Sequence, residues 1–128
     1  MVDTRGVPAY RMSPVGVEPA PPGYHTCMRI GPIQLRLPFA QAGLAGYSDR
    51  AMRLVARRRG CPYAVTEALL DVIMLNGGEG LRRAIDIDAE DHPVAGQLIG
   101  SEPLEMARAA LILHRAGYDV IDLNFACR

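Results

Sequence analysis

The sequence has 128 residues, and its 14 basic and 14 acidic side chains give a formal net charge of zero. A protein that binds nucleic acid on its own is normally basic overall, so this balance argues against that class, although it allows a local basic patch. Three cysteines without C-x-x-C spacing favour reduced thiols over a disulfide framework or a zinc site, and no apolar run approaches the roughly 20 residues of a membrane span. Without a secretory signal pattern at the N-terminus, the expectation is a cytoplasmic protein without a metal or a membrane segment.

Residues 1–26 contain five of the ten prolines and show no apolar periodicity. Proline fixes φ and removes a backbone donor, so a disordered leader is expected here. A proline-rich docking site is the alternative, but no clean P-x-x-P pattern with flanking basic residues stands out. Residues 27–128 are then expected to form the folded body.

The body is predicted to begin with a small β-hairpin. Residues 27–30 and 33–37 flank the turn pair Gly31-Pro32, which is typical of a hairpin connection. Residues 38–42 are short and mostly apolar, and they are a candidate buried strand.

A helix is predicted to follow, with Ser48 as its N-cap and Gly60 at its end. Arg50, Arg53 and Arg57 share one face of this helix, and that face is expected to be solvated. The opposite, apolar face is formed by Ala51, Met52, Leu54, Val55 and Ala56.

The second strand is predicted at residues 63–67, followed by a broken helical stretch at 69–75 and a short turn at 81–85. Residues 93–99 are the third predicted strand.

The last helix is expected to start at a Ser101 N-cap and to end at Gly117, and the β-branched residues Val120 and Ile121 mark a fourth strand. Its predicted buried side consists of Leu104, Ala107, Leu111, Met106, Ala110 and Leu113.

The resulting order is β-α-β-α-β-α-β, which indicates a parallel sheet with right-handed crossovers. Two α/β architectures fit this order, an open doubly wound sheet and part of a (β/α)8 TIM barrel. A full barrel takes about 250 residues, so four strands with their connecting helices would form about half of one.

Small or polar residues occur at the end of every predicted strand. They are residues 42–46 after the first strand, Glu67 after the second, Gln97 in the third, and Asn124 and Cys127 after the fourth. Because parallel α/β folds bind ligands at the carboxyl ends of their strands, this pattern predicts a site. No G-x-G-x-x-G follows the first strand, so a Rossmann dinucleotide site is not expected.

Each of these residues also has a structural interpretation. Gly43 and Gly46 can be turn glycines, as an alternative to close approach of the backbone to a ligand. Gln97 can bond a neighbouring backbone group, Glu67 can be a charge at the start of a helix, and Cys127 can be a small hydrophobic residue.

The chain from Met28 onward resembles the N-terminal part of tRNA-dihydrouridine synthases. The stretch "MRIGPIQLRLP" is similar to the family's opening hairpin. "AGLAGYSDRAMRLVARRRGCPYAVTEALL" resembles the family pattern A-P-M-A-G-x-S/T-D…R with its following S/T-E-M strand. "HPVAGQLIGSEPLEMARAALILHRAGYDVIDLNFACR" resembles the pattern P-V-x-x-Q-L/I-x-G-S/A-D/E-P and the strand end D-I/L-N-x-G-C-P.

The resemblance implies a partial (β/α)8 TIM barrel, namely the first four strands of an FMN-binding barrel preceded by the hairpin. It also implies a flavoprotein oxidoreductase of tRNA processing, in which NADPH reduces FMN and a uridine in tRNA becomes dihydrouridine. In this resemblance Gly43, Leu44 and Ala45 line the flavin, and Gln97 hydrogen-bonds the isoalloxazine ring.

The same resemblance implies the residues on the substrate side. Asn124 lies near the flavin and the target uracil, Glu67 lies near the site, and Cys127 protonates C5 of the base. A thiol is a workable general acid for that step.

The sequence also departs from the family pattern. Gly43 stands where the family usually has proline, Ala126 replaces a glycine, and Arg128 replaces a proline. Three hypotheses stay open: a synthase polypeptide that is cut short and incomplete alone, a non-enzymatic half-barrel that self-associates through its open sheet edges, and another FMN-dependent oxidoreductase.

Overall fold

The computed structural model describes residues 28–126. The predicted leader, residues 1–26, and the predicted proton donor, Cys127, lie outside the described residues. The elements are β1 (Met28–Ile30), β2 (Ile33–Leu35), α1 (Arg50–Arg58), β3 (Ala64–Leu70), α2 (Asp71–Asn76), α3 (Gly78–Ala84), the short 3-10 helix η1 (Ala89–Asp91), β4 (Val94–Ile99), α4 (Pro103–Ala116) and β5 (Val120–Leu123).

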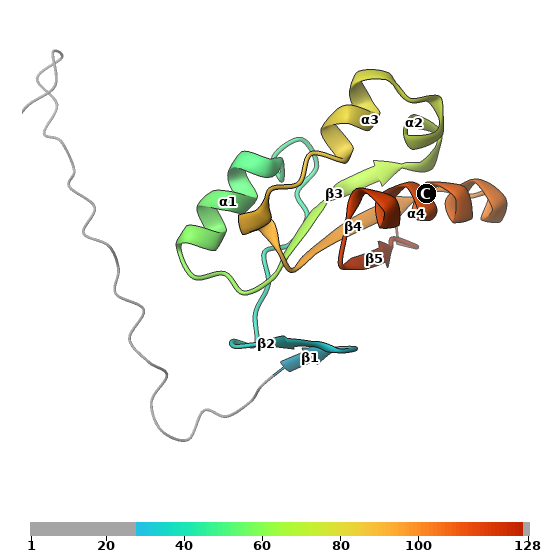
Figure 1. Ribbon diagram of the computed structural model, residues 1–128. Coiled ribbons are helices and arrows are strands. Elements are labelled where there is room, and N and C mark those ends of the chain that lie inside the picture. The colour runs from blue at the N-terminus through green and yellow to red at the C-terminus, as the bar shows by residue number, and fades with distance from the viewer. Residues whose placement is uncertain (1–27, 127–128) are drawn as a thin grey trace, which may run out of the picture.

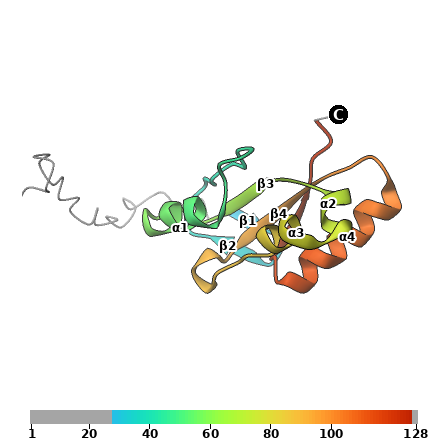
Figure 2. The same ribbon diagram turned by 90° about the horizontal axis from the view of Figure 1, so that it is seen from above.

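A three-stranded parallel sheet in the order β3-β4-β5 forms the centre of the fold. Figure 1 shows the antiparallel pair β1-β2 on the opposite side of this sheet from α1, α2 and α3. Seen from above in Figure 2, α1 lies at one end of the molecule and α2, α3 and α4 gather toward the other. The chain is therefore an α/β fold, as the alternating pattern predicts.

The two faces of β4 belong to two different cores. Val94 and Leu98 point into the core shared with α2, α3 and α4, whereas Ala95 packs with Leu35 of β2 and Tyr63. A strand that is buried on both faces is typical of the centre of a parallel sheet. Gln97 lies two residues after Ala95 on the same face, and this position gives its side chain access to the inner, hairpin-side surface.

The predicted strand at residues 38–42 is reduced to a single parallel bridge between Gln41 and Ala64. Gln41 N–H donates to the Tyr63 carbonyl at 2.9 Å, and Val65 N–H donates to the Gln41 carbonyl at 3.1 Å. Pro38 has no N–H to extend this ladder, and Phe39 is 51% exposed. The prediction of a buried strand here was wrong in both length and burial.

The N-caps of the two longer helices also differ from the prediction. Asp49 caps α1, because its Oδ1 accepts from Met52 N–H at 2.8 Å. Ser48 instead accepts from Leu44 N–H, which serves the preceding loop. The N-cap of α4 is Glu102, which makes no side-chain cap bond, so Ser101 is not the cap.

The predicted solvated face of α1 is wrong for Arg53, which is only 3% exposed. Its guanidinium holds the fully buried carboxylate of Asp91 through bonds of 2.6, 2.9 and 3.1 Å. Arg57 is also partly buried and donates to main-chain carbonyls, while Val55 of the predicted buried face is 60% exposed. A buried anion 38 residues away thus draws Arg53 inward, whereas Arg50 of the same predicted face is exposed as expected.

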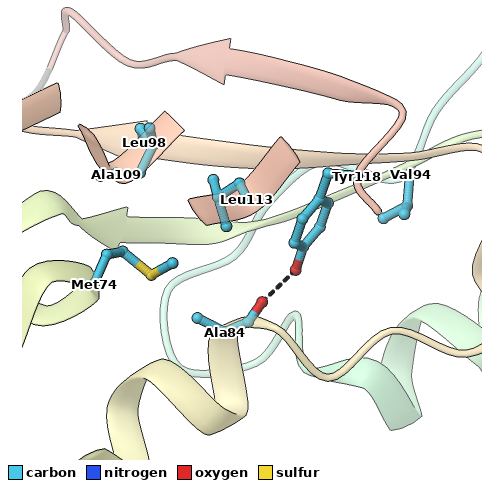
Figure 3. Close-up of a cluster of buried hydrophobic side chains, with 7 residues drawn as sticks. All are labelled: Met74, Ala84, Val94, Leu98, Ala109, Leu113 and Tyr118. Carbon is cyan, nitrogen blue, oxygen red and sulfur yellow. Dashed lines mark hydrogen bonds between the residues drawn. The ribbon is translucent and has the colours of Figure 1, made fainter. Parts of the chain in front are cut away.

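Only one of the two predicted apolar stripes of α4 faces the core. Met106, Ala110 and Leu113 pack there, whereas Leu104 is 76% and Leu111 52% exposed. Gly117 ends α4 in the left-handed conformation, as predicted. Figure 3 shows the core beneath this helix, where the Tyr118 hydroxyl reaches the Ala84 carbonyl and ties α3 to the start of β5. The residues of this core are Met74, Ala84, Val94, Leu98, Ala109, Leu113 and Tyr118.

Candidate functional site

Three polar side chains and one backbone amide form a continuous hydrogen-bonded row at the ends of β4 and β5, which we call the amide array. Gln97 Nε2 donates to Asp122 Oδ2 at 2.7 Å, and Asn124 Nδ2 donates to Gln97 Oε1 at 3.2 Å. Ala126 N–H donates to Asn124 Oδ1 at 3.0 Å. The array thus runs from Asp122 to the residue immediately before Cys127.

The strand register explains why these side chains meet. Gln97 and Asp122 are direct partners in the parallel pair β4-β5, so they extend from the same face of the sheet as neighbours. Asn124 follows β5, and its N–H continues the ladder by donating to the Leu98 carbonyl at 2.8 Å. Backbone pairing therefore holds all three side chains close together toward the carboxyl ends of β4 and β5.

Thr66 joins the array to the loop that precedes α1. Its buried hydroxyl accepts from Gln97 N–H at 3.0 Å, at an irregularity of the β3-β4 register. On the other side, a Cβ added to Gly43 would lie 2.1 Å from the Thr66 carbonyl oxygen. Glycine at position 43 is required by this close approach of the loop to β3.

Two side chains hold the loop at residues 43–46. Glu67 Oε2 accepts from Gly46 N–H at 2.5 Å, and Ser48 Oγ accepts from Leu44 N–H at 2.6 Å. Gly46 has φ +75°, with nothing within 4 Å of an added Cβ, so it acts as a turn glycine. The loop is fixed over the middle of β3, and Leu44 is half exposed there.

The hydrogen bonds sort the predicted site residues into two groups. Gln97 and Asn124 share the amide array, while Glu67 is bonded to the loop that contains Gly43, Leu44 and Ala45. Thr66 is the link between the two groups. The structural interpretation of Gln97, a bond from its side chain to a neighbouring backbone group, was wrong, because its side-chain amide bonds two side chains and its backbone N–H donates to the Thr66 hydroxyl.

Two members of this arrangement, Asp122 and Thr66, were not among the predicted site residues. Period-two alternation puts Asp122 on the same face as Val120, which packs against the hairpin-side core. That alternation was a signal for Asp122. Thr66 had a weaker signal, its place beside Glu67 at the end of the second predicted strand, and its contact with Gln97 could not be predicted because it depends on an irregular strand register.

Two carboxylates and one guanidinium act on Tyr63, which lies on the hairpin side of the sheet. Burial raises the pKa of the Tyr63 hydroxyl, and the nearby carboxylates of Asp122 and Asp119 raise this pKa further, while Arg57 opposes the shift. Tyr63 lies in the hairpin-side core, so the carboxylate of Asp122 acts on this face.

A cavity of about 770 Å³ lies on the helix side of β3, between α1 and α3. Gly46, Thr66 and Glu67 line it together with Arg50 and Tyr118. Gln97 and Asn124 are not part of its lining. The cavity thus lies on the helix side of the sheet, next to the loop at residues 43–46. The amide array lies on the opposite, hairpin side of the sheet.

Within residues 28–126, no helix is long and apolar enough to cross a membrane. In the same part of the chain, no three His, Cys, Asp or Glu side chains are grouped so that they could hold a metal ion.

Comparison with known proteins identifies similar sequences. The family model described as dihydrouridine synthase (Dus) matches residues 40–127. The tRNA-dihydrouridine synthase B of Pseudomonas aeruginosa is 33% identical over 100 residues, which cover 78% of this chain and 30% of that protein. The protein of the same description from Escherichia coli (strain K12) is 36% identical over 101 residues, covering 78% of this chain and 31% of that protein. The chain therefore spans less than a third of the length of these curated relatives.

Proposed function

Because the chain belongs to the dihydrouridine synthase family, we propose that it takes part in reducing uridine in tRNA to dihydrouridine. FMN is the proposed cofactor, NADPH the proposed reductant, and the cytoplasm the proposed location. The observation that carries this proposal is the amide array, which joins Gln97 to Asn124 at the carboxyl ends of β4 and β5. Parallel α/β folds bind their ligands at the carboxyl ends of the strands.

The proposed architecture is the first part of a (β/α)8 TIM barrel. The sheet β3-β4-β5 supplies three of its parallel strands, and the bridge at Gln41 marks the place of the strand before them. The hairpin β1-β2 packs on the inner face below the array and covers the end of the barrel away from the site. Support comes from the parallel register and from the family match.

The residues present fit a flavin ring in two respects. The Gln97 amide carries a donor and an acceptor side by side, which matches the neighbouring N–H and C=O groups at the pyrimidine edge of the ring. In the loop at residues 43–46, which Glu67 and Ser48 hold, Gly43 and Ala45 add little side-chain bulk. FMN, when bound, supplies the reducing equivalents that add to the C5=C6 bond of the base.

The chain's own part in the chemistry centres on proton supply and on binding. Cys127 is the proposed proton donor to C5, since a thiol can act as a general acid near neutral pH. Asn124 Oδ1 holds the N–H of Ala126, the residue before Cys127, and we propose that this bond orients the segment that carries the thiol. We propose that Glu67 acts near the substrate by holding the loop at residues 43–46 in place.

A second candidate function is favoured by exposed apolar side chains on α4 and around the end of β5, which we call the apolar strip. Leu104 and Leu111 of α4 are largely exposed, as are Leu123 at the end of β5 and Phe125 after it. Association of two copies through this strip and the open edge of β5 would bury these side chains. Sedimentation at several protein concentrations distinguishes a monomer from such a dimer.

The flavin proposal is tested by titrating the purified chain with FMN and following quenching of flavin fluorescence. We expect saturable binding, and we expect Gln97→Leu to weaken it by about tenfold or more, because a bidentate contact is lost. Gln34→Leu is the matched control, since Gln34 is an exposed residue of the hairpin. Absence of any FMN binding to the wild-type chain would contradict unaided cofactor binding.

A further inference from the structure

We propose that Asp122 is a positioning residue that sets the direction of hydrogen bonding through the whole amide array. The direction itself follows from the array's geometry alone. Its consequence for ligand binding rests on the proposed function above.

The carboxylate of Asp122 determines which end of the Gln97 amide faces it. A carboxylate accepts hydrogen bonds and donates none, so the group that Gln97 turns toward Asp122 must be its NH2. The carbonyl oxygen of Gln97 must then face Asn124, which therefore turns its own NH2 toward Gln97.

The last bond of the array has the same direction. With its NH2 directed at Gln97, Asn124 presents Oδ1 to the N–H of Ala126. An amide has nearly the same shape in either orientation, so packing alone does not fix which end is oxygen. Asp122 is the acceptor-only member of the row, and its 2.7 Å bond is shorter than the 3.2 and 3.0 Å bonds that follow. Charge assistance makes that first bond the strongest of the three.

This direction determines what Gln97 can recognise. Each amide nitrogen has two hydrogens, and each amide oxygen has two lone pairs. Gln97 therefore has a further N–H and a further lone pair in a fixed order along the sheet edge. They complement a cyclic lactam edge, in which an N–H group stands next to a C=O group. Flavin and uracil both contain such an edge, so the shared chemistry is the lactam and the experiment separates its two sources.

The inference is tested with two variants and one control. Asp122→Asn keeps the shape of the side chain but makes it both donor and acceptor, so only the donor N–H of Ala126, at the other end of the array, still favours the observed direction. The double variant Asp122→Asn with Gln97→Glu moves the carboxylate to position 97, where it accepts from both neighbours. That change restores the direction at Asn124 and removes the donor at position 97. The control is Asp86→Asn, because Asp86 is a half-exposed carboxylate paired with Arg50.

The first measurement uses the protein without ligand. Hydrogen exchange of the Ala126 amide, followed by NMR, reports whether Asn124 still presents its oxygen. We expect exchange about tenfold faster in Asp122→Asn, and wild-type exchange in the double variant and in the control. An Asp122→Asn protein with wild-type exchange at Ala126 would overturn the inference. If that variant does not fold, the double variant decides alone: protection of Ala126 supports the inference, and loss of protection contradicts it.

The second measurement is titration with FMN and, separately, with uridine. We expect both Asp122→Asn and the double variant to bind the lactam ligand about tenfold more weakly than wild type, with the control unchanged. Weakening for FMN alone assigns the lactam to the flavin, and weakening for uridine alone assigns it to the base. Undiminished binding of both ligands to the double variant would contradict the recognition step. If the wild-type chain binds neither ligand, unaided binding fails, while the exchange measurement still decides the role of Asp122.

Discussion

Tyr118 illustrates how a single polar atom is accommodated in this core. The residue is 5% exposed, and its hydroxyl donates to the Ala84 carbonyl at 2.5 Å. That carbonyl belongs to the last residue of α3, where the helix leaves its final carbonyls without partners inside the helix. The bond therefore satisfies a buried acceptor and fastens α3 to the core.

Burial raises the pKa of the Tyr118 hydroxyl to about 12 from its ordinary value of 10.0. A raised native pKa means that stability is fully present below pH 10 and falls as the pH rises toward 12. We expect a loss of about 2–3 kcal/mol in the free energy of unfolding across this range, measured by urea denaturation. Tyr118→Phe should be less stable at neutral pH by about 1–3 kcal/mol, because it leaves the Ala84 carbonyl unpaired. An equally steep pH dependence in that variant would rule out Tyr118 as its source.

At the residue scale, the sequence indicated where the polar side chains of the site lie but not what they contact. Gln97 and Asn124 were predicted from their places at strand ends, and the structure joins them. Their connection through Asp122 needs the β4-β5 register, which one sequence does not contain. Gly43 was interpreted as a turn glycine or as a point of approach to a ligand, whereas the Thr66 carbonyl is what requires it.

At the scale of elements, β4 and α4 were predicted well because their signals are local. Pro103 starts α4 and Gly117 ends it, and continuous apolar residues mark β4. The burial pattern of helix α1 was predicted wrongly at Arg53 and Val55, because a distant charge draws Arg53 into the interior. Arg53 also donates to the main-chain carbonyls of Ser48 and Asp86, at 3.2 Å each. Arg53 thus ties α1 to η1 and to Ser48, which follows the loop at residues 43–46.

Arg53→Met should therefore be strongly destabilising, since it leaves the carboxylate of Asp91 buried without its partner. We expect a loss of about 3–5 kcal/mol in the free energy of unfolding by urea denaturation. Arg50→Met, in the same helix, removes only the half-exposed pair with Asp86 and should cost less than about 1 kcal/mol. Similar losses in the two variants would show that the Arg53 pair has no special role.

At the scale of the whole molecule, hairpin, sheet and helices form layers around β4. This arrangement leaves the carboxyl ends of three parallel strands free to carry the amide array and the loop at residues 43–46. The α/β class and the family were both predicted from the sequence, because strand–helix alternation and motif order extend along most of the chain. The proposed activity concerns a longer protein, since the chain covers 30% of the Pseudomonas aeruginosa relative.

The central claim is that this chain supplies a working part of a tRNA-dihydrouridine synthase. Its most direct test is a chimera in which the chain replaces the matched 100 residues of the Pseudomonas aeruginosa relative. The product is dihydrouridine in tRNA taken from a strain that lacks the modification. We expect product with the wild-type chimera and with Cys61→Ala, and about a hundredfold less with Cys127→Ala. A chimera that folds and binds FMN but forms no dihydrouridine would contradict the claim.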